Sequence, residues 1–391
     1  MPDGRDSLAV KVVSRIAEVP AAAWDACAGG NPFVSHAFLD ALEESGSTTA
    51  DSGWLPQHLV LENPNGGPGN ELLGCAPLYL KSHSYGEYVF DWNWADAYER
   101  AGGRYYPKLQ CSVPFTPATG PRLLVNPAAD QREVMTGLVA AMLELARRHQ
   151  VSSLHITFPP KEQYDMLGDV GLLQRLGVQY HWQNRGYGSF DDFLADLTSR
   201  KRKAIKKERR KVAESGIRLR PLTGGEIEPQ HWDAFFEFYT ATADRKWGQP
   251  YLTREFFHLL GERLADKVVL VMADDDGELV AGALNLKSGD TLYGRNWGCL
   301  GRFRFLHFET CYYQAIDYAI AQGLTWVEAG AQGEHKIQRG YLPTATYSAH
   351  WIADPNFSHA VEEFLVRERE AMEYEIEGLG EHSPFKEDEA N

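Results

Sequence analysis

Two strand-like segments in different halves of the chain share one pattern, and this repetition constrains the fold more than any other feature. Segments 73–82 and 280–288 both carry an apolar run that ends in Leu-Lys-Ser. Each is followed by a second strand pattern, at 85–91 and at 291–297, then by a helix pattern and a strand that ends in polar residues. That order predicts duplication of one α/β unit. Chance similarity of two apolar strands is the alternative, and the shared order of elements argues against it.

The length of the chain predicts more than one domain. With 391 residues, of which 43% are hydrophobic, it can bury a sizeable core and form two or three domains. We predict an N-terminal domain at 1–186, with a long aromatic insert at 91–122, and a C-terminal domain at 187–379. The acidic segment 380–391 is expected to be disordered.

Charge and cysteine content exclude several classes of protein. A formal net charge of −15 disfavours general affinity for nucleic acids or membrane surfaces, although a local basic patch can still bind an anion. The 5 cysteines are widely spaced without a CxxC pair, which predicts neither a disulfide framework nor a metal site. No apolar run is long enough to span a bilayer, and the first residues lack the apolar core of a signal peptide. We therefore expect a cytoplasmic protein.

Polar residues of several chemical kinds follow an apolar strand pattern at 324–327. They include carboxylates, an amide, an imidazole, cations and a phenol, beside glycines that permit close approach of a ligand. Acyl transfer to an amine needs a base, donors for the oxyanion and an acid. We predict Glu328 as the base, Tyr341 as the acid and His335 as a proton relay. A polar surface loop without a catalytic role is the alternative.

A basic helix is predicted at 199–215, and a glycine ends it at Gly216. Cations between Arg200 and Lys211 cover most of its surface. They could neutralise the phosphates of a tRNA or of a nucleotide-linked precursor. A solvated helix face without a partner is the alternative. The thin apolar stripe consists of Ala204, Ile205, Val212 and Ala213.

Six short motifs in the chain resemble one known family. They are Tyr-Pro-Lys at 106–108, Pro-Phe-Thr-Pro at 114–117, Gly-Pro-Arg at 120–122, His-Ile-Thr-Phe at 155–158, Asp-Arg-Lys-Trp-Gly at 244–248 and Glu-His-Lys at 334–336. In combination they resemble the FemAB-like family of N-acyltransferases linked to peptidoglycan biosynthesis or recognition, from about Ser35 to Ser383. The resemblance implies an α/β fold with mixed sheets, built from two tandem GNAT-like acyltransferase domains.

The resemblance leaves two acyl donors open. FemAB-type members transfer an amino acid from aminoacyl-tRNA to a peptidoglycan precursor, whereas GNAT enzymes acetylate amines from acetyl-CoA. GNAT enzymes hold the CoA pyrophosphate on a turn with the pattern Gln/Arg-x-x-Gly-x-Gly/Ala. Arg295 and Gly298 match it as candidate cofactor-binding residues, but Leu300 replaces the small residue. We expect acyl-CoA or aminoacyl-tRNA as a cosubstrate and no permanently bound cofactor.

The other candidate residues are expected to bind substrate through cations, amides and aromatic rings. The insert could cover the substrate or could be a rigid structural segment, and both alternatives stay open. The candidates are Tyr106, Lys108, Gln110, Arg122, Arg245, Lys246, Trp247, Tyr251, Asn285, Arg295, Trp297, Gln332, Lys336 and Arg339.

The sequence thus predicts an N-acyltransferase that moves an acyl or aminoacyl group to the amine of an anionic, cell-envelope-type acceptor. An acetyl-CoA-dependent acetyltransferase of a small amine is one alternative. A non-catalytic protein that binds a peptidoglycan-type precursor is the other. The sequence indicates no oligomeric state.

Overall fold

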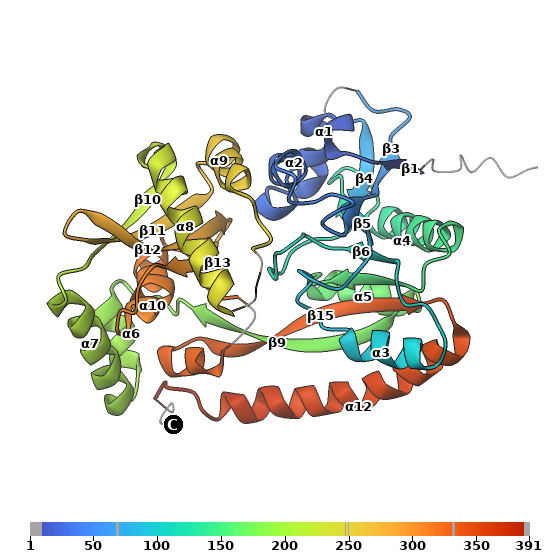
Figure 1. Ribbon diagram of the computed structural model, residues 1–391. Coiled ribbons are helices and arrows are strands. Elements are labelled where there is room, and N and C mark those ends of the chain that lie inside the picture. Colours follow the sequence, from blue (N-terminus) through green and yellow to red (C-terminus); the bar gives the residue numbers. More distant parts are fainter. Residues whose placement is uncertain (1–9, 68–69, 247, 249, 331–332, 387–391) are drawn as a thin grey trace, which may run out of the picture. The chain divides into compact units, whose positions relative to one another are not determined.

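The computed structural model describes residues 10–67, 70–246, 248, 250–330 and 333–386 (Figure 1). The side chains of residues 244–246 are also outside the description. The chain forms two compact units. Unit 1 comprises Met1–Gly177 and Thr346–Ala371, and unit 2 comprises Val178–Ala345 and Met372–Asn391.

Unit 1 contains two groups of paired strands with helices between them. Strands β1, β3, β4 and β7 form a four-stranded sheet in that order, and the order β15-β8-β6-β5-β2 forms the second group. The elements are β1 (Val10–Val13), η1 (Ile16–Glu18), α1 (Ala21–Ala28), η2 (Pro32–Val34), α2 (His36–Glu44), β2 (Trp54–Pro56), β3 (His58–Glu62), β4 (Leu72–Ala76), β5 (Leu78–Lys81), α3 (Trp92–Arg100), β6 (Lys108–Cys111), β7 (Leu124–Val125), α4 (Gln131–Arg148), β8 (Ser153–Thr157) and α5 (Lys161–Asp169).

The core of unit 1 lies between helix α4 and the strands. Asp130 caps α4, because its side chain accepts a hydrogen bond from the backbone N–H of Glu133. Val134, Leu138 and Met142 follow at helical spacing and are buried against strand residues. Burying each such side chain contributes roughly 1.5–3 kcal/mol. Helix α4 is the helix that the repeated order of elements predicts in the first half of the chain.

Unit 2 contains the strand order β10-β11-β12-β13-β14-β9, and helix α8 packs on strands β12 and β13 (Figure 1). The elements are α6 (Phe190–Asp196), α7 (Ser199–Glu214), β10 (Arg218–Thr223), η3 (Gly224–Glu226), α8 (Pro229–Lys246), α9 (Arg254–Arg263), β11 (Val268–Asp275), β12 (Glu278–Ser288), β13 (Thr291–Cys299), α10 (Leu306–Phe308), the π-helical turn η4 (Glu309–Tyr313), α11 (Gln314–Ala321), β14 (Trp326–Glu328) and η5 (Glu334–Arg339).

Three elements contribute residues to both units. They are strands β9 (Leu173–Gln183) and β15 (Leu342–Ile352) and helix α12 (Pro355–Gly380). The chain therefore passes between the units more than once, unlike the predicted single boundary at 186/187. The physical reason is long-range strand pairing, since β15 returns and pairs with β8 in antiparallel register from Ser348 to Ile352.

Three local expectations differ from the structure. Segment 85–91 is not a strand, because Gly86 and Tyr88 have positive φ of 81° and 62° and break the extended backbone. The insert at 91–122, which its sequence predicts to be a long irregular loop, contains helix α3 and strand β6. The tail is ordered through residue 386, because Phe385 is 7% exposed and packs against Phe193. Residues 387–391 lie outside the described part.

An order of elements recurs in both units, but the second strand of unit 1 is β6 and not the segment 85–91 that the sequence predicted. In unit 1, antiparallel β5 and β6 are followed by a helical crossover to β8, which is parallel to β6. In unit 2, antiparallel β12 and β13 are followed by a helical crossover to β14, which is parallel to β13. Among the described residues, no helix combines the length and apolar character needed to cross a membrane.

Candidate functional site

Strands β13 and β14 separate within unit 2. Their parallel pairing runs only from Thr291 and Trp326 to Tyr293 and Glu328, although β13 continues to Cys299. Beyond that point, residues of β13 from Gly294 to Trp297 line a pocket, and concave sites of this kind are where ligands commonly bind.

A β-bulge aims one side chain at this opening. Leu284 pairs with Asn296 and Asn285 pairs with Gly294, so Arg295 is the extra residue between the two pairs. Bulges redirect side chains and are common next to active sites. The side chain of Arg295 therefore lines the opening. In a regular strand its direction would follow the alternation of side chains between the two faces of the sheet.

The opening is a pocket of about 470 Å³ within unit 2. Strands β12 and β13, the turn after β14, the helical stretch that contains η4, and η5 all contribute to its wall. The lining residues are Ala283, Leu284, Asn285, Gly294, Arg295, Asn296, Trp297, His307, Cys311, Tyr312, Ala329, Gly330, Gly333, His335 and Lys336.

Lys336 is a nearly fully buried cation in this pocket. Its side chain donates a hydrogen bond to the carbonyl oxygen of Gly330 at 2.8 Å, and the residue is 2% exposed. Burial lowers the pKa of Lys336 to about 8. Among the described residues this is the one hydrogen bond of its amine, and an ammonium has three N–H bonds, so it can also donate to a carbonyl oxygen of a substrate.

His335 and Tyr312 form a polar pair on the same wall. The Nε2 atom of His335 lies 3.0 Å from the hydroxyl of Tyr312. The imidazole lies against Gly333, where an added Cβ would be 2.4 Å from its Cε1 atom. Tyr312 belongs to η4, and π-helical turns recur at functional sites because they offset the side chains that follow. The sequence patterns did not identify Tyr312, Cys311 or His307.

The predicted base and acid are not among the described lining residues of the pocket, although both adjoin residues that are. Glu328 lies across from His181, with 3.9 Å between Oε2 and Nε2, and burial lowers the pKa of that histidine to about 4. Tyr341 is fully buried and its hydroxyl donates to the carbonyl oxygen of Tyr312 at 3.1 Å. Burial also raises the pKa of Tyr341 well above its usual value. The described residues that line the pocket include neither Glu328 nor Tyr341.

Among the other predicted residues of unit 2, Asn285, Arg295 and Trp297 line the pocket. Arg339 is instead buried at 7% exposure and stacks on Phe308, with 3.4 Å from its Cζ atom to the ring centroid. Tyr251 is 37% exposed in the segment before α9, and it is not among the described lining residues. Trp247, Gln332 and the side chains of Arg245 and Lys246 lie outside the described residues.

The proposed CoA motif does not form the turn that the sequence predicted. Arg295 and Gly298 both lie inside β13. A Cβ at Gly298 would be 2.2 Å from the backbone carbon of Phe238, so this glycine allows α8 to pack closely on β13. The turn follows at Leu300, and a second cavity of about 630 Å³ there is lined by residues that include Arg302 and Arg304.

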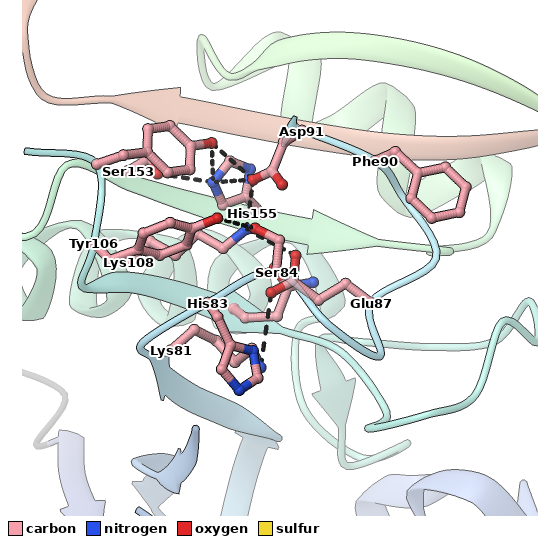
Figure 2. Close-up of polar contacts among 12 residues, drawn as sticks. Lys81, His83, Ser84, Glu87, Phe90, Asp91, Tyr106, Lys108, Ser153 and His155 are labelled. Atoms are coloured by element: carbon pink, nitrogen blue, oxygen red, sulfur yellow. Dashed lines mark hydrogen bonds and ion pairs between the residues drawn. The ribbon is translucent and has the colours of Figure 1, made fainter. Parts of the chain in front are cut away.

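The predicted substrate residue Lys108 belongs to a buried ionic cluster in unit 1. Figure 2 shows its amine directed at Ser84, Glu87 and Asp91, with 2.7 Å to both the Ser84 and Glu87 oxygens. The same cluster contains Lys81, whose Nζ lies 3.9 Å from Glu87. Glu87 and Lys108 are both buried. The partners of the Lys108 amine in this structure are therefore other groups inside the protein.

Burial and neighbouring charges perturb the pKa values of this cluster. Burial raises the pKa of Glu87 to about 7 and lowers that of Lys81 to about 7. The pKa of His155 falls to about 3, chiefly through burial. The cluster thus contains a carboxyl and an amine that both titrate near neutral pH.

The remaining predicted residues of unit 1 also have internal partners. Tyr106 bonds to the hydroxyl of Ser84 at 2.9 Å. Gln110 is buried and donates to the hydroxyl of Thr157 at 3.1 Å. Arg122 is 1% exposed and donates to backbone carbonyl oxygens, including that of Ala118 at 2.7 Å. These contacts favour the structural alternative for the insert.

The basic helix is confirmed as α7, and Ile205 and Val212 are its buried residues. Ala204 and Ala213 are exposed, so the apolar stripe is narrower than predicted. Lys203, Lys206 and Lys207 lie on the exposed surface of the helix.

The chain belongs to the FemAB-like family, described as peptidoglycan biosynthesis/recognition, whose pattern matches residues 15–387. Its fold is similar to that of FemX, with a TM-score of 0.54 and 12% identity over 91% of this chain and 100% of that chain. L-PGS from Bacillus licheniformis is similar with a TM-score of 0.51 and 9% identity, over 86% of this chain and 97% of that chain. No curated protein matches the chain. The predicted family and the predicted α/β fold with mixed sheets are confirmed.

Proposed function

We propose that this protein transfers an acyl or aminoacyl group to the amine of an anionic precursor of the cell envelope, in the pocket of unit 2. One observation carries the proposal. A buried ammonium, that of Lys336, lies beside the His335–Tyr312 pair where β13 and β14 separate. Family membership supports the cell-envelope acceptor.

In this proposal the acceptor amine attacks the carbonyl carbon of the acyl donor. A C–N bond forms, and the C–O bond of an ester or the C–S bond of a thioester breaks. Lys336 donates a hydrogen bond to the carbonyl oxygen as negative charge develops there. The imidazole of His335 accepts the proton that the nitrogen loses, and the leaving oxygen or sulfur receives a proton. Arg295 binds an anionic group of a substrate.

Two donors remain candidates because different surfaces of unit 2 favour each of them. The exposed cations of α7 suit a polyphosphate such as tRNA. The cavity with Arg302 and Arg304 at the turn after β13 suits the phosphates of acyl-CoA. Since that turn differs from the GNAT pattern, we place aminoacyl-tRNA first.

The activity is tested by supplying charged tRNAs and acyl-CoAs with peptidoglycan-precursor acceptors and detecting the amide product by mass. Lys336→Met should lower kcat by about 100-fold, the usual effect of losing an oxyanion donor. Lys336→Arg keeps the charge and should retain part of the rate. Tight acceptor binding without product from any donor would instead indicate the precursor-binding alternative.

The donor is tested with Lys203→Glu, Lys207→Glu and Arg210→Glu combined. Each phosphate that α7 no longer neutralises should flatten the slope of log affinity for tRNA against log salt by about 0.7. The matched control is Arg132→Glu, Arg147→Glu and Arg148→Glu combined, which makes the same charge change on exposed residues of α4. Equal slopes in the two variants, with saturable acetyl-CoA binding, would favour acyl-CoA.

A further inference from the structure

Helix α7 has an inner face that differs chemically from its exposed cations. Ile205 and Val212 are buried, and Glu208 and Arg209 are half-buried between them. These positions share one side of a helix because they are spaced by three and four residues. An acidic residue therefore lies on the inner side of a strongly basic helix.

Glu208 is held by two residues from separate segments of unit 2. Its carboxylate accepts hydrogen bonds from Arg339 at 2.9 and 3.1 Å. It also accepts one from the hydroxyl of Tyr313. The side chains of Glu208 and Arg339 are 16% and 9% exposed, so solvent screens this ion pair less than a surface pair.

Both partners of Glu208 belong to segments that form the pocket wall. Tyr313 ends η4, which contains the pocket residues Cys311 and Tyr312. Arg339 ends η5, which contains His335 and Lys336.

Arg339 also connects Glu208 to the backbone of the pocket. Its Nη1 atom donates to the carbonyl oxygen of His335 at 2.8 Å. That carbonyl belongs to the peptide bond between His335 and Lys336. The hydrogen bond therefore restrains the backbone between the imidazole and the buried amine. Through Arg339, the Glu208 carboxylate therefore restrains both groups.

We propose that Glu208 is a positioning residue for the acyl-transfer pocket, which makes α7 part of the catalytic framework as well as a basic surface. The proposal rests on the function proposed above. Glu208 does not line the pocket among the described residues, and it acts by holding η4 and η5 in register. Displacement of a reacting group by about 1 Å can lower a rate by about 100-fold.

The test compares two charge-neutralising variants of the same helix. Glu208→Gln should lower kcat by about tenfold or more while KM for the acceptor changes less than about twofold, because geometry rather than binding is lost. Glu214→Gln is the matched control, since Glu214 pairs with Lys211 on the exposed surface of α7. It should leave both constants unchanged.

A second measurement is independent of acyl transfer. Cys311 lines the pocket and is the one cysteine that is not buried. Its labelling by a disulfide reagent should be several-fold faster in Glu208→Gln than in wild type, and unchanged in Glu214→Gln. A labelling change without any acyl transfer would support the positioning of η4 and reject the proposed function.

Folded Glu208→Gln with wild-type kcat and wild-type labelling overturns the proposal. If that variant does not fold, Glu208→Asp replaces it, because aspartate keeps the charge and shortens the reach by one methylene. Glu208→Asp must then lower kcat and speed the labelling of Cys311. Wild-type values of both in Glu208→Asp also reject the proposal.

Discussion

At the scale of residues, the pocket depends on a cation kept inside the protein. Lys336 loses solvation on burial, which lowers its pKa to about 8 from an ordinary value of 10.5. The protonated form is the one that can stabilise an oxyanion. A buried amine close to its pKa therefore makes the proposed activity sensitive to pH.

We predict that kcat falls as the pH rises through about 8 in wild type, because the ammonium with this lowered pKa loses its proton. In Lys336→Arg this alkaline limb should be absent, since a guanidinium stays protonated throughout that range. The measurement is a pH profile of kcat from neutral to alkaline pH, on both proteins. An alkaline limb of the same midpoint in the arginine variant would assign it to another group.

Tyr341 lies in a core cluster of unit 2 and is not among the described residues that line the proposed site. Tyr341→Phe removes one buried hydrogen bond to the carbonyl oxygen of Tyr312 and should lower the free energy of unfolding by about 1 kcal/mol. Turnover should stay within about twofold of wild type. Urea denaturation and kcat measure the two effects. A large fall in kcat with unchanged stability would restore Tyr341 as the acid.

At the scale of elements, the segment between β5 and α3 is held by buried charges. Lys81 ends β5 and Lys108 begins β6, and both lie near Glu87 of this segment. Among the described residues, the Oε1 atom of Glu87 has no hydrogen-bond partner. Ionising a buried carboxyl costs more free energy when one of its oxygens has no hydrogen-bond partner, which agrees with the raised pKa of Glu87.

The shifted pKa values of Glu87 and Lys81 predict opposite dependences of folding stability on pH. The folded protein keeps the Glu87 proton up to about 7, whereas the unfolded chain loses it near the ordinary value of 4.5, so this group's contribution falls as pH rises between them. Lys81 deprotonates near 7 when folded and near 10.5 when unfolded, so its contribution rises with pH in that window.

The comparison that isolates Glu87 is Glu87→Gln against wild type in urea, at pH values from about 4.5 to about 7. The stability of the variant relative to wild type should rise across that range, because only wild type retains the carboxyl. Glu99→Gln is the control, since it changes the same charge at an exposed residue of α3 in unit 1. A relative stability that stays flat with pH would place the pKa of Glu87 near its ordinary value.

At the scale of the whole molecule, the chain returns to a unit that it has already left. Unit 1 is completed by Thr346–Ala371, which follow nearly all of unit 2 in the sequence. Ala349 from this return lies in the main core of unit 1, and Val361 and Leu365 lie in a smaller one. His350 also contacts His155, with 2.7 Å between their Nδ1 atoms.

A fragment cut at the predicted boundary, 1–186, should therefore fail to fold cooperatively. It lacks the strand that pairs with β8 and the helix that buries Trp94 and Tyr105. Thermal unfolding followed by near-ultraviolet circular dichroism measures this, with the full chain as the reference. A sharp transition in the fragment would show that 1–186 is an independent domain.

The sequence by itself determined the class of fold and the position of the polar loop. Strand and helix periodicities, the repeated order of elements and the glycines around His335 and Lys336 are local properties of the chain. They also identified the basic helix, whereas the pocket residue Arg295 was identified through the resemblance to the GNAT pattern.

Only the tertiary structure decided which polar groups face the pocket and which are internal. The bulge at Arg295 and the separation of β13 from β14 follow from strand register, which depends on pairing between distant segments. Glu208 and Arg339 are 131 positions apart, so no local pattern connects them. Lys336 and Lys108 are both buried, but Lys336 lines the pocket whereas Lys108 pairs with carboxylates in an ionic cluster. The free energy of each charge depends on the partners that folding brings to it.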